Sequence, residues 1–190
     1  MSLLILGLAI FFIVHASTMA RGARAGLVQR FGEGTYKGAY SALSLVGIVL
    51  VVWGFAQYRG AGIVPYYAPP AFGRHLGPLL LLISFILIAS ANMKPGYIKS
   101  SVKHPFLLSI ALWALAHLLM NGDQGGLLLF GAFLVYVLID LAAVFARPPV
   151  AMPAPDWRYD ARAIVGGIVV LFLFIFIVHP YIFQIPINLG

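Results

Sequence analysis

Long runs of apolar residues, each bounded by a short polar segment, dominate the chain. A helix needs about 20 mostly apolar residues to cross a bilayer core, and several of these runs reach or approach that length. Gly and Pro cluster in the segments between the runs, as they do in turns. The pattern predicts an all-α, polytopic membrane protein, a bundle of about six transmembrane helices at residues 2–20, 39–57, 75–93, 105–121, 125–146 and 163–185.

Composition supports this assignment. Of the 190 residues, 62% are hydrophobic and only 9% are charged, whereas a soluble domain carries about 25% charged residues. The loops are too short to hold a soluble core, so we expect a single transmembrane domain over residues 1–190, with the lipid bilayer as its immediate partner. The absence of cysteine excludes disulfides, thiolate ligands and cysteine nucleophiles.

The basic residues lie mostly on one side of the predicted helices. Of the 12 Lys and Arg residues, only Arg59 and Arg74 fall in the loops of the opposite side. Because basic loops stay in the cytoplasm, the first, third and fifth loops are predicted to be cytoplasmic and both termini exoplasmic. This arrangement accounts for the net charge of +7, so the charge does not indicate nucleic-acid binding.

Histidine is the main polar residue type within the apolar runs. Ionisable side chains inside a bilayer are costly and often mark a site. His104 and His117 share the fourth predicted helix. Their spacing places them roughly 20 Å apart along its axis and about 140° apart around it, so they cannot bind the same metal.

His15, in the first predicted helix, is the first choice of partner for His117. Their depths in the membrane differ by on the order of 10 Å. Two imidazoles from facing helices, each about 2 Å from iron, can hold a haem across such a gap. Trp113 and the small Ala114, beside His117, suit the close approach of a flat macrocycle. The alternative, in which each histidine only hydrogen-bonds to a neighbouring helix, stays open.

The other histidines have different expected roles. His179, which precedes a proline, lies at roughly the depth of His117 and is the second choice for the second metal ligand. His104 and His75 stand at the starts of helices, where a basic residue near lipid headgroups is the simpler interpretation.

Three acidic residues have candidate structural roles. Asp140 either orients a histidine through that histidine's second ring nitrogen or pairs with a basic loop residue. Asp123 is expected to cap the fifth helix. Glu33 lies in the basic first loop, so we expect it to pair with an arginine. No motif for a nucleotide, a zinc hydrolase or a catalytic triad is present.

Four stretches within residues 10–145 carry a family resemblance: "FGEGTYKGAYSALSLVGIVLVVWGFA", "RHLGPLLLLISFILI", "KHPFLLSIALWALAHLLMNGD" and "LLLFGAFLVYVLID". Together they resemble the NnrU family of bacterial inner-membrane proteins. The resemblance implies a multi-pass location in the bacterial inner membrane and an association with nitrite and nitric oxide respiration.

The chain is also similar to the zeta-carotene isomerase of plants and cyanobacteria, a membrane enzyme that uses haem b to isomerise a polyene double bond. That resemblance implies His15 and His117 as the haem ligands. It also implies a supporting role near the cofactor for His104, which belongs to a shared His-Pro pair. Where the isomerase has a cysteine near the second histidine, this chain has Ala114.

Two hypotheses of different classes follow. In the first, the protein binds haem b through His15 and His117 and serves nitrogen-oxide respiration or redox chemistry; as an enzyme, it would be a haem-dependent cis–trans isomerase of a carotenoid-like polyene. Its partners would be an apolar polyene substrate or a respiratory protein. In the second, the protein is a cofactor-free accessory or assembly protein of a respiratory complex, and its histidines only join helices.

Overall fold

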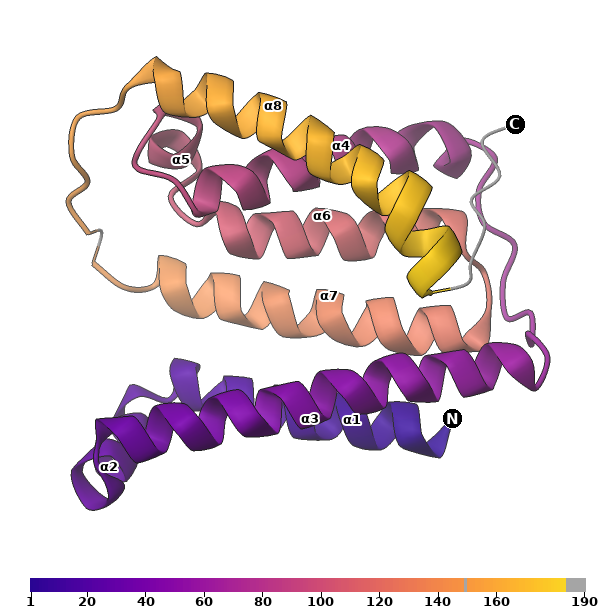
Figure 1. Ribbon diagram of the computed structural model, residues 1–190, viewed down its shortest axis with the longest axis horizontal. Coiled ribbons are helices and arrows are strands. Elements are labelled where there is room, and N and C mark those ends of the chain that lie inside the picture. The colour runs from indigo at the N-terminus through magenta and orange to yellow at the C-terminus, as the bar shows by residue number, and fades with distance from the viewer. Residues whose placement is uncertain (149, 184–190) are drawn as a thin grey trace. The chain divides into compact units, whose positions relative to one another are not determined.

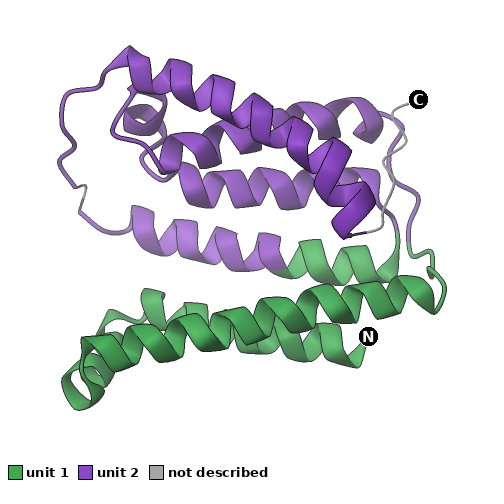
Figure 2. Ribbon diagram, viewed as in Figure 1, with its two compact units in different colours: residues 1–66, 123–132 green, residues 67–122, 133–190 purple. Residues whose placement is uncertain are grey.

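The computed structural model describes residues 1–148 and 150–183, and the regular structure within them is helical (Figure 1). The chain forms two compact units (Figure 2). Unit 1 comprises residues 1–66 and 123–132, and unit 2 comprises residues 67–122 and 133–190. Neither unit is a continuous segment, because the chain leaves unit 1, returns to it and leaves it again.

Unit 1 contains α1 (Ser2–Met19), α2 (Arg21–Phe31), α3 (Glu33–Gly60) and the beginning of α7 (Gln124–Phe145). The basic segment expected as a loop is the helix α2, because most of its residues, including alanine, arginine and leucine, are good helix formers. Helix α3 also begins earlier than predicted, at Glu33.

Glycines set the close packing of α1 against α3. A Cβ atom on Gly7 would lie 2.6 Å from the backbone nitrogen of Val51 and 2.9 Å from the carbonyl oxygen of Gly47. Gly54 faces the backbone of Leu4 in the same way. Small residues of this kind let the backbones of membrane helices approach closely and gain dispersion contacts. The α1–α3 seam, defined by these residues, is therefore the core of unit 1.

Two acidic residues of unit 1 test the sequence predictions. The carboxylate of Asp123 accepts a hydrogen bond of 2.8 Å from the backbone N–H of Gly126, which confirms it as the cap of α7. Glu33 pairs with Lys37 at 3.0 Å, so the predicted arginine partner was wrong. The reason is local: residues four apart on a helix are neighbours, and the first loop is helical here.

Unit 2 contains α4 (Gly73–Ala91), α5 (Tyr97–Val102), α6 (Pro105–Met120), the remainder of α7, α8 (Trp157–Leu173) and the π-helix η1 (Phe174–Ile182). Helix α4 packs against both α6 and α8 (Figure 1). The buried hydroxyl of Ser84 donates to the carbonyl of Ser109 at 2.8 Å, which joins α4 to α6. On its other side, α4 approaches α8 at Gly167, where a Cβ atom would meet the backbone of Ile86.

Side chains from outside each helix satisfy backbone groups at the end of α4 and at the start of α5. The Lys99 ammonium donates to the carbonyls of Ala91 and Met93 at the end of α4, at 2.8 and 2.6 Å. The Asp160 carboxylate, from the first turn of α8, accepts from the backbone N–H groups of Tyr97 and Ile98 at 2.7 and 3.0 Å. Backbone groups at helix ends have no partner within the helix, so these contacts stabilise both ends.

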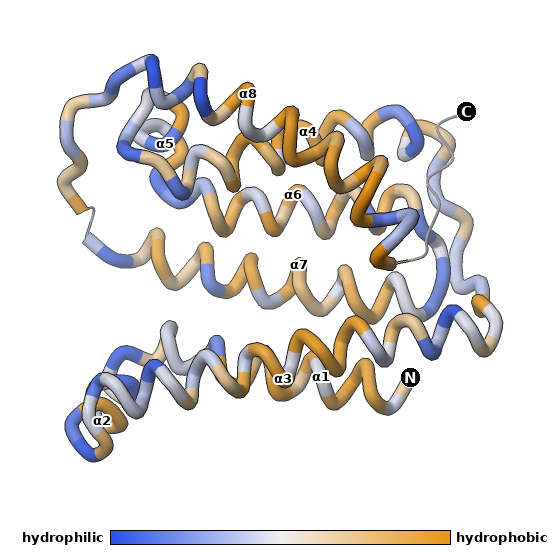
Figure 3. Tube along the Cα trace, viewed as in Figure 1, coloured by the Kyte–Doolittle hydropathy of each residue, from blue (hydrophilic) through white to orange (hydrophobic). Residues whose placement is uncertain are grey.

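Five helices of the described residues are long and apolar enough to cross a membrane: Ser2–Met19, Glu33–Gly60, Gly73–Ala91, Gln124–Phe145 and Trp157–Ile182. The fourth predicted span is the apolar but shorter α6, with 16 residues. The last predicted span, 163–185, is divided into α8 and η1, and its final two residues lie outside the described part. Figure 3 shows hydrophilic residues at the start of α8 and mostly hydrophobic ones further along that helix.

Candidate functional site

His15 lies on α1, held between two aromatic rings of unit 1. Its imidazole stacks on Phe11 with ring centroids 3.9 Å apart and planes at 24°, and Tyr40 of α3 lies 5.2 Å away. His15 Nδ1 is 2.8 Å from the carbonyl oxygen of Phe11, one turn earlier. The ring is therefore fixed both by its hydrogen bond and by its aromatic neighbours.

A polar group next to His15 was not anticipated from the sequence. The Ser17 hydroxyl donates to the carbonyl of Val14, so it accepts the hydrogen of the Tyr36 hydroxyl, 2.8 Å away. The Arg24 guanidinium lies 5.6 Å from the centroid of the Tyr36 ring. Ser17 and Tyr36 are 19 positions apart, so no local pattern could have indicated their contact.

His117 lies in the last turn of α6, in unit 2. Its Nδ1 is 2.8 Å from the carbonyl oxygen of Trp113, and the two rings have centroids 5.2 Å apart. Trp113 also makes an edge-to-face contact with Phe133 at 5.5 Å. Ala114 is completely buried among protein atoms. The structure thus places Trp113 against His117 and packs Ala114 within the protein.

His179 lies within η1, where the backbone has π-helical geometry. Its Nδ1 is 3.0 Å from the carbonyl oxygen of Phe174, five residues earlier. The rings of Phe174 and Phe183 stand roughly edge-on to it, with centroids 6.2 and 5.6 Å away. Pro180 has no N–H to donate, which favours departure from α-helical bonding at this point.

These three histidines share one protonation pattern. A carbonyl oxygen can only accept a hydrogen bond, so Nδ1 of His15, His117 and His179 must carry the hydrogen in each case. In the neutral ring, Nε2 then carries the in-plane lone pair that can bind a metal ion. A metal-binding histidine is oriented in the same way, with its second ring nitrogen donating to a backbone carbonyl. The donor set therefore fits axial ligation of haem iron.

The histidines are divided between the units. His15 belongs to unit 1 and His117 to unit 2, so their predicted pairing stays a prediction. His117 and His179 both belong to unit 2, and the structure brings them together: their ring centroids are 6.5 Å apart and their planes differ by 12°. No group of three or more His, Asp or Glu side chains suited to a metal ion occurs among the described residues.

The remaining candidates lie at helix ends or on partly exposed surfaces. His75 is exposed near the start of α4. His104 precedes α6 and packs edge-on against Phe145 at 5.2 Å. Lys103, just before it, has a positive φ of 63°. Asp140 is half-buried on α7. Its predicted ion pair with a basic residue is not found within the described residues, where the ion pair joins Glu33 to Lys37.

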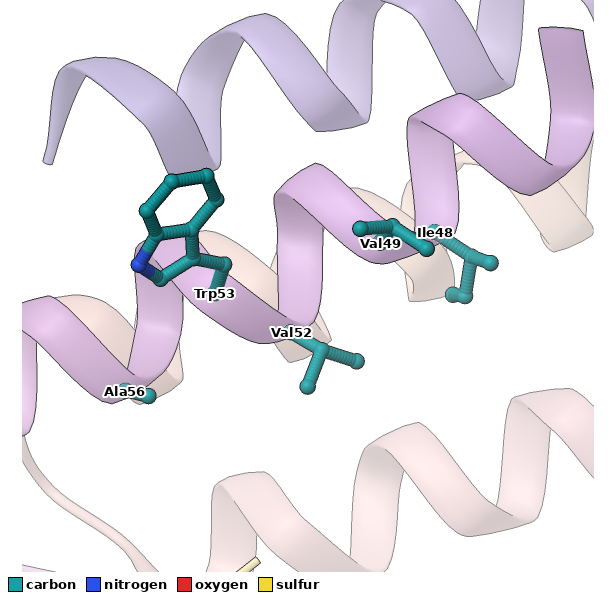
Figure 4. Close-up of a pocket in the computed structure, with 5 residues that line it drawn as sticks. All are labelled: Ile48, Val49, Val52, Trp53 and Ala56. Atoms are coloured by element: carbon teal, nitrogen blue, oxygen red, sulfur yellow. The ribbon is translucent and has the colours of Figure 1, made fainter.

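A shallow apolar depression lies on α3. It is lined by aliphatic and aromatic side chains from a single face of that helix: Ile48, Val49, Val52, Trp53 and Ala56 (Figure 4). Trp53 is 57% exposed. A surface of this composition offers no metal ligand and suits a hydrocarbon chain.

Comparison with protein families matches residues 3–187 to the family described as NnrU protein. Searches of curated proteins and of solved structures found no match for the chain. The family match includes His15, His117 and His179 and residues of both compact units. This chain belongs to the NnrU family.

Proposed function

We propose that this protein is a multi-pass bacterial inner-membrane protein that binds haem b through two histidines, with His117 as one axial ligand. The observation that supports the proposal is the shared orientation of the imidazoles of His15, His117 and His179. Each donates from Nδ1 to a carbonyl of its own helix, which leaves Nε2 as the ligating nitrogen.

Two histidines are candidates for the second axial position. The sequence predicts His15, which belongs to unit 1, as the partner of His117. Phe11 and Tyr40 would fix the plane of the His15 ring, and Trp113 would shield one side of His117 from lipid. His179 is the other candidate.

When bound, haem supplies one-electron redox chemistry and, in its ferrous form, a Lewis-acidic metal. The family name and the resemblance support two roles for it: redox or nitrogen-oxide respiration with a respiratory partner, or cis–trans isomerisation of a carotenoid-like polyene. The chain itself contributes the ligands, their orientation and apolar surroundings.

Visible spectroscopy tests haem binding. The wild-type protein, expressed with haem supplementation and purified in detergent, is expected to show a Soret band, with sharp α and β bands on reduction by dithionite. His117→Ala should lose this spectrum, whereas His75→Ala, which changes an exposed histidine, should keep it. A wild-type protein without bound haem would contradict the proposal and favour the cofactor-free accessory protein.

Added imidazole separates loss of a ligand from loss of the fold. A cavity left by His117→Ala can admit free imidazole, which then occupies the vacant iron position. Recovery of the low-spin spectrum in this variant would support His117 as an axial ligand. A variant that keeps the wild-type low-spin spectrum before any imidazole is added would exclude that role.

A further inference from the structure

We propose that His179 supplies the second axial imidazole, opposite His117, so that unit 2 alone provides both ligands. This inference rests on the proposed haem function and identifies a residue of the same site. It starts from His117 and His179, which are the pair of histidines with a ring-to-ring contact among the described residues of unit 2.

The distance between the two rings fits a metal between them. Two metal–nitrogen bonds of about 2 Å, with about 1 Å from each nitrogen to its ring centroid, place trans imidazole centroids about 6 Å apart. The observed centroid distance is 6.5 Å. A tetrahedral ion such as Zn²⁺ would draw the centroids to about 5 Å, so the observed spacing favours ligands on opposite sides of the metal.

The rings are parallel without being in direct face contact. Their planes differ by 12°. For comparison, Phe11 and His15 stack directly, with centroids 3.9 Å apart. The larger separation of His117 and His179 therefore differs from ordinary stacking between rings in van der Waals contact.

The backbone at His179 is π-helical and not α-helical. The π-helix from Phe174 to Ile182 follows directly after the α-helical part of the last long helix. It allows Nδ1 of His179 to donate to the carbonyl five residues earlier, at Phe174. π-Helical turns within α-helices are rare and occur frequently at functional sites. Here the altered turn sets the orientation of a ligand-competent imidazole.

Aromatic groups enclose the pair. Trp113 contacts His117, and Phe174 and Phe183 surround His179. Apolar surroundings exclude water and tune the iron that two imidazoles hold. No comparable contact joins His104 to this pair among the described residues, because its ring packs on Phe145.

The test compares His179→Ala with the matched variant His15→Ala, each in the full-length protein with haem. The readouts are visible and electron paramagnetic resonance spectra. His179→Ala is expected to convert six-coordinate low-spin iron to a high-spin form that binds carbon monoxide when reduced. His15→Ala should keep the wild-type low-spin spectrum. Added imidazole should restore low-spin iron in His179→Ala.

Three results would overturn the inference. One is a low-spin spectrum in His179→Ala that matches the wild type. Another is equal loss of low-spin iron in both variants, because the loss would then not be specific to His179. The third is failure of imidazole to restore the spectrum of His179→Ala. Conversion by His15→Ala alone would establish His15 as the partner and leave the proposed haem function intact, whereas wild-type protein without haem would overturn both.

Discussion

The substitution Gly7→Ala tests the α1–α3 seam directly. The added Cβ atom would lie 2.6 Å from the backbone nitrogen of Val51 and 2.9 Å from the carbonyl oxygen of Gly47. All of its nearest neighbours are backbone atoms, so rotation of a side chain cannot relieve the contact. The two helices must separate by roughly 1 Å to restore an ordinary carbon–nitrogen distance, which is about 3.5 Å.

Overpacking and helix propensity act in opposite directions on the free energy of unfolding of Gly7→Ala. Overpacking of a close interface costs about 1–3 kcal/mol. Alanine favours a helix interior over glycine by up to about 1 kcal/mol. We therefore expect Gly7→Ala to lower the free energy of unfolding by about 1–2 kcal/mol, because separation of the helices also weakens dispersion contacts along the seam.

Gly38→Ala is the matched control. Gly38 lies within α3, and a Cβ atom there would have no neighbour within 4 Å. The same substitution should therefore leave stability unchanged or raise it by up to about 1 kcal/mol. Unfolding in detergent, followed by the helical circular dichroism signal, measures both variants. Gly7→Ala protein as stable as Gly38→Ala protein would refute the packing argument.

Two further predictions concern unit 2. Lys103 has a φ of 63°, so Lys103→Gly is expected to raise the free energy of unfolding by about 1 kcal/mol through relief of backbone strain, whereas Lys103→Ala should not. Equal stability of the two variants would count against strain. Asp160 accepts from two N–H groups at the start of α5, so Asp160→Asn should cost about 2 kcal/mol and accelerate hydrogen exchange in α5. Unchanged exchange there would show that the carboxylate does not hold that helix.

The long apolar runs were sufficient to predict the helical class and the approximate positions of the apolar helices. Long apolar runs can satisfy their backbone groups in lipid only as helices, which is why this level of prediction succeeds. The cap at Asp123 was also predictable, because capping depends on neighbouring residues. The partner of Glu33 was mispredicted because the basic first loop forms the helix α2 and an early start of α3, which brings Lys37 one turn away.

The arrangement at the candidate site depends on tertiary contacts and could not be predicted in the same way. The sequence indicated histidines inside helices, but the parallel orientation of His117 and His179 depends on how η1 packs and on its π-helical turn. Pro180 was the one local signal of that irregularity. The contact of Asp160 with the start of α5 spans more than 60 positions and left no pattern in the sequence.

Haem content per chain is the most direct test of the central claim that His117 binds iron. The pyridine haemochrome assay, applied to protein expressed with haem supplementation, measures it without assuming any activity. Stoichiometric haem in the wild type and in His75→Ala, with loss of haem in His117→Ala and recovery with imidazole, is the predicted result. Equal haem content together with the same low-spin spectrum in wild-type and His117→Ala protein, or no haem in either, would contradict the account.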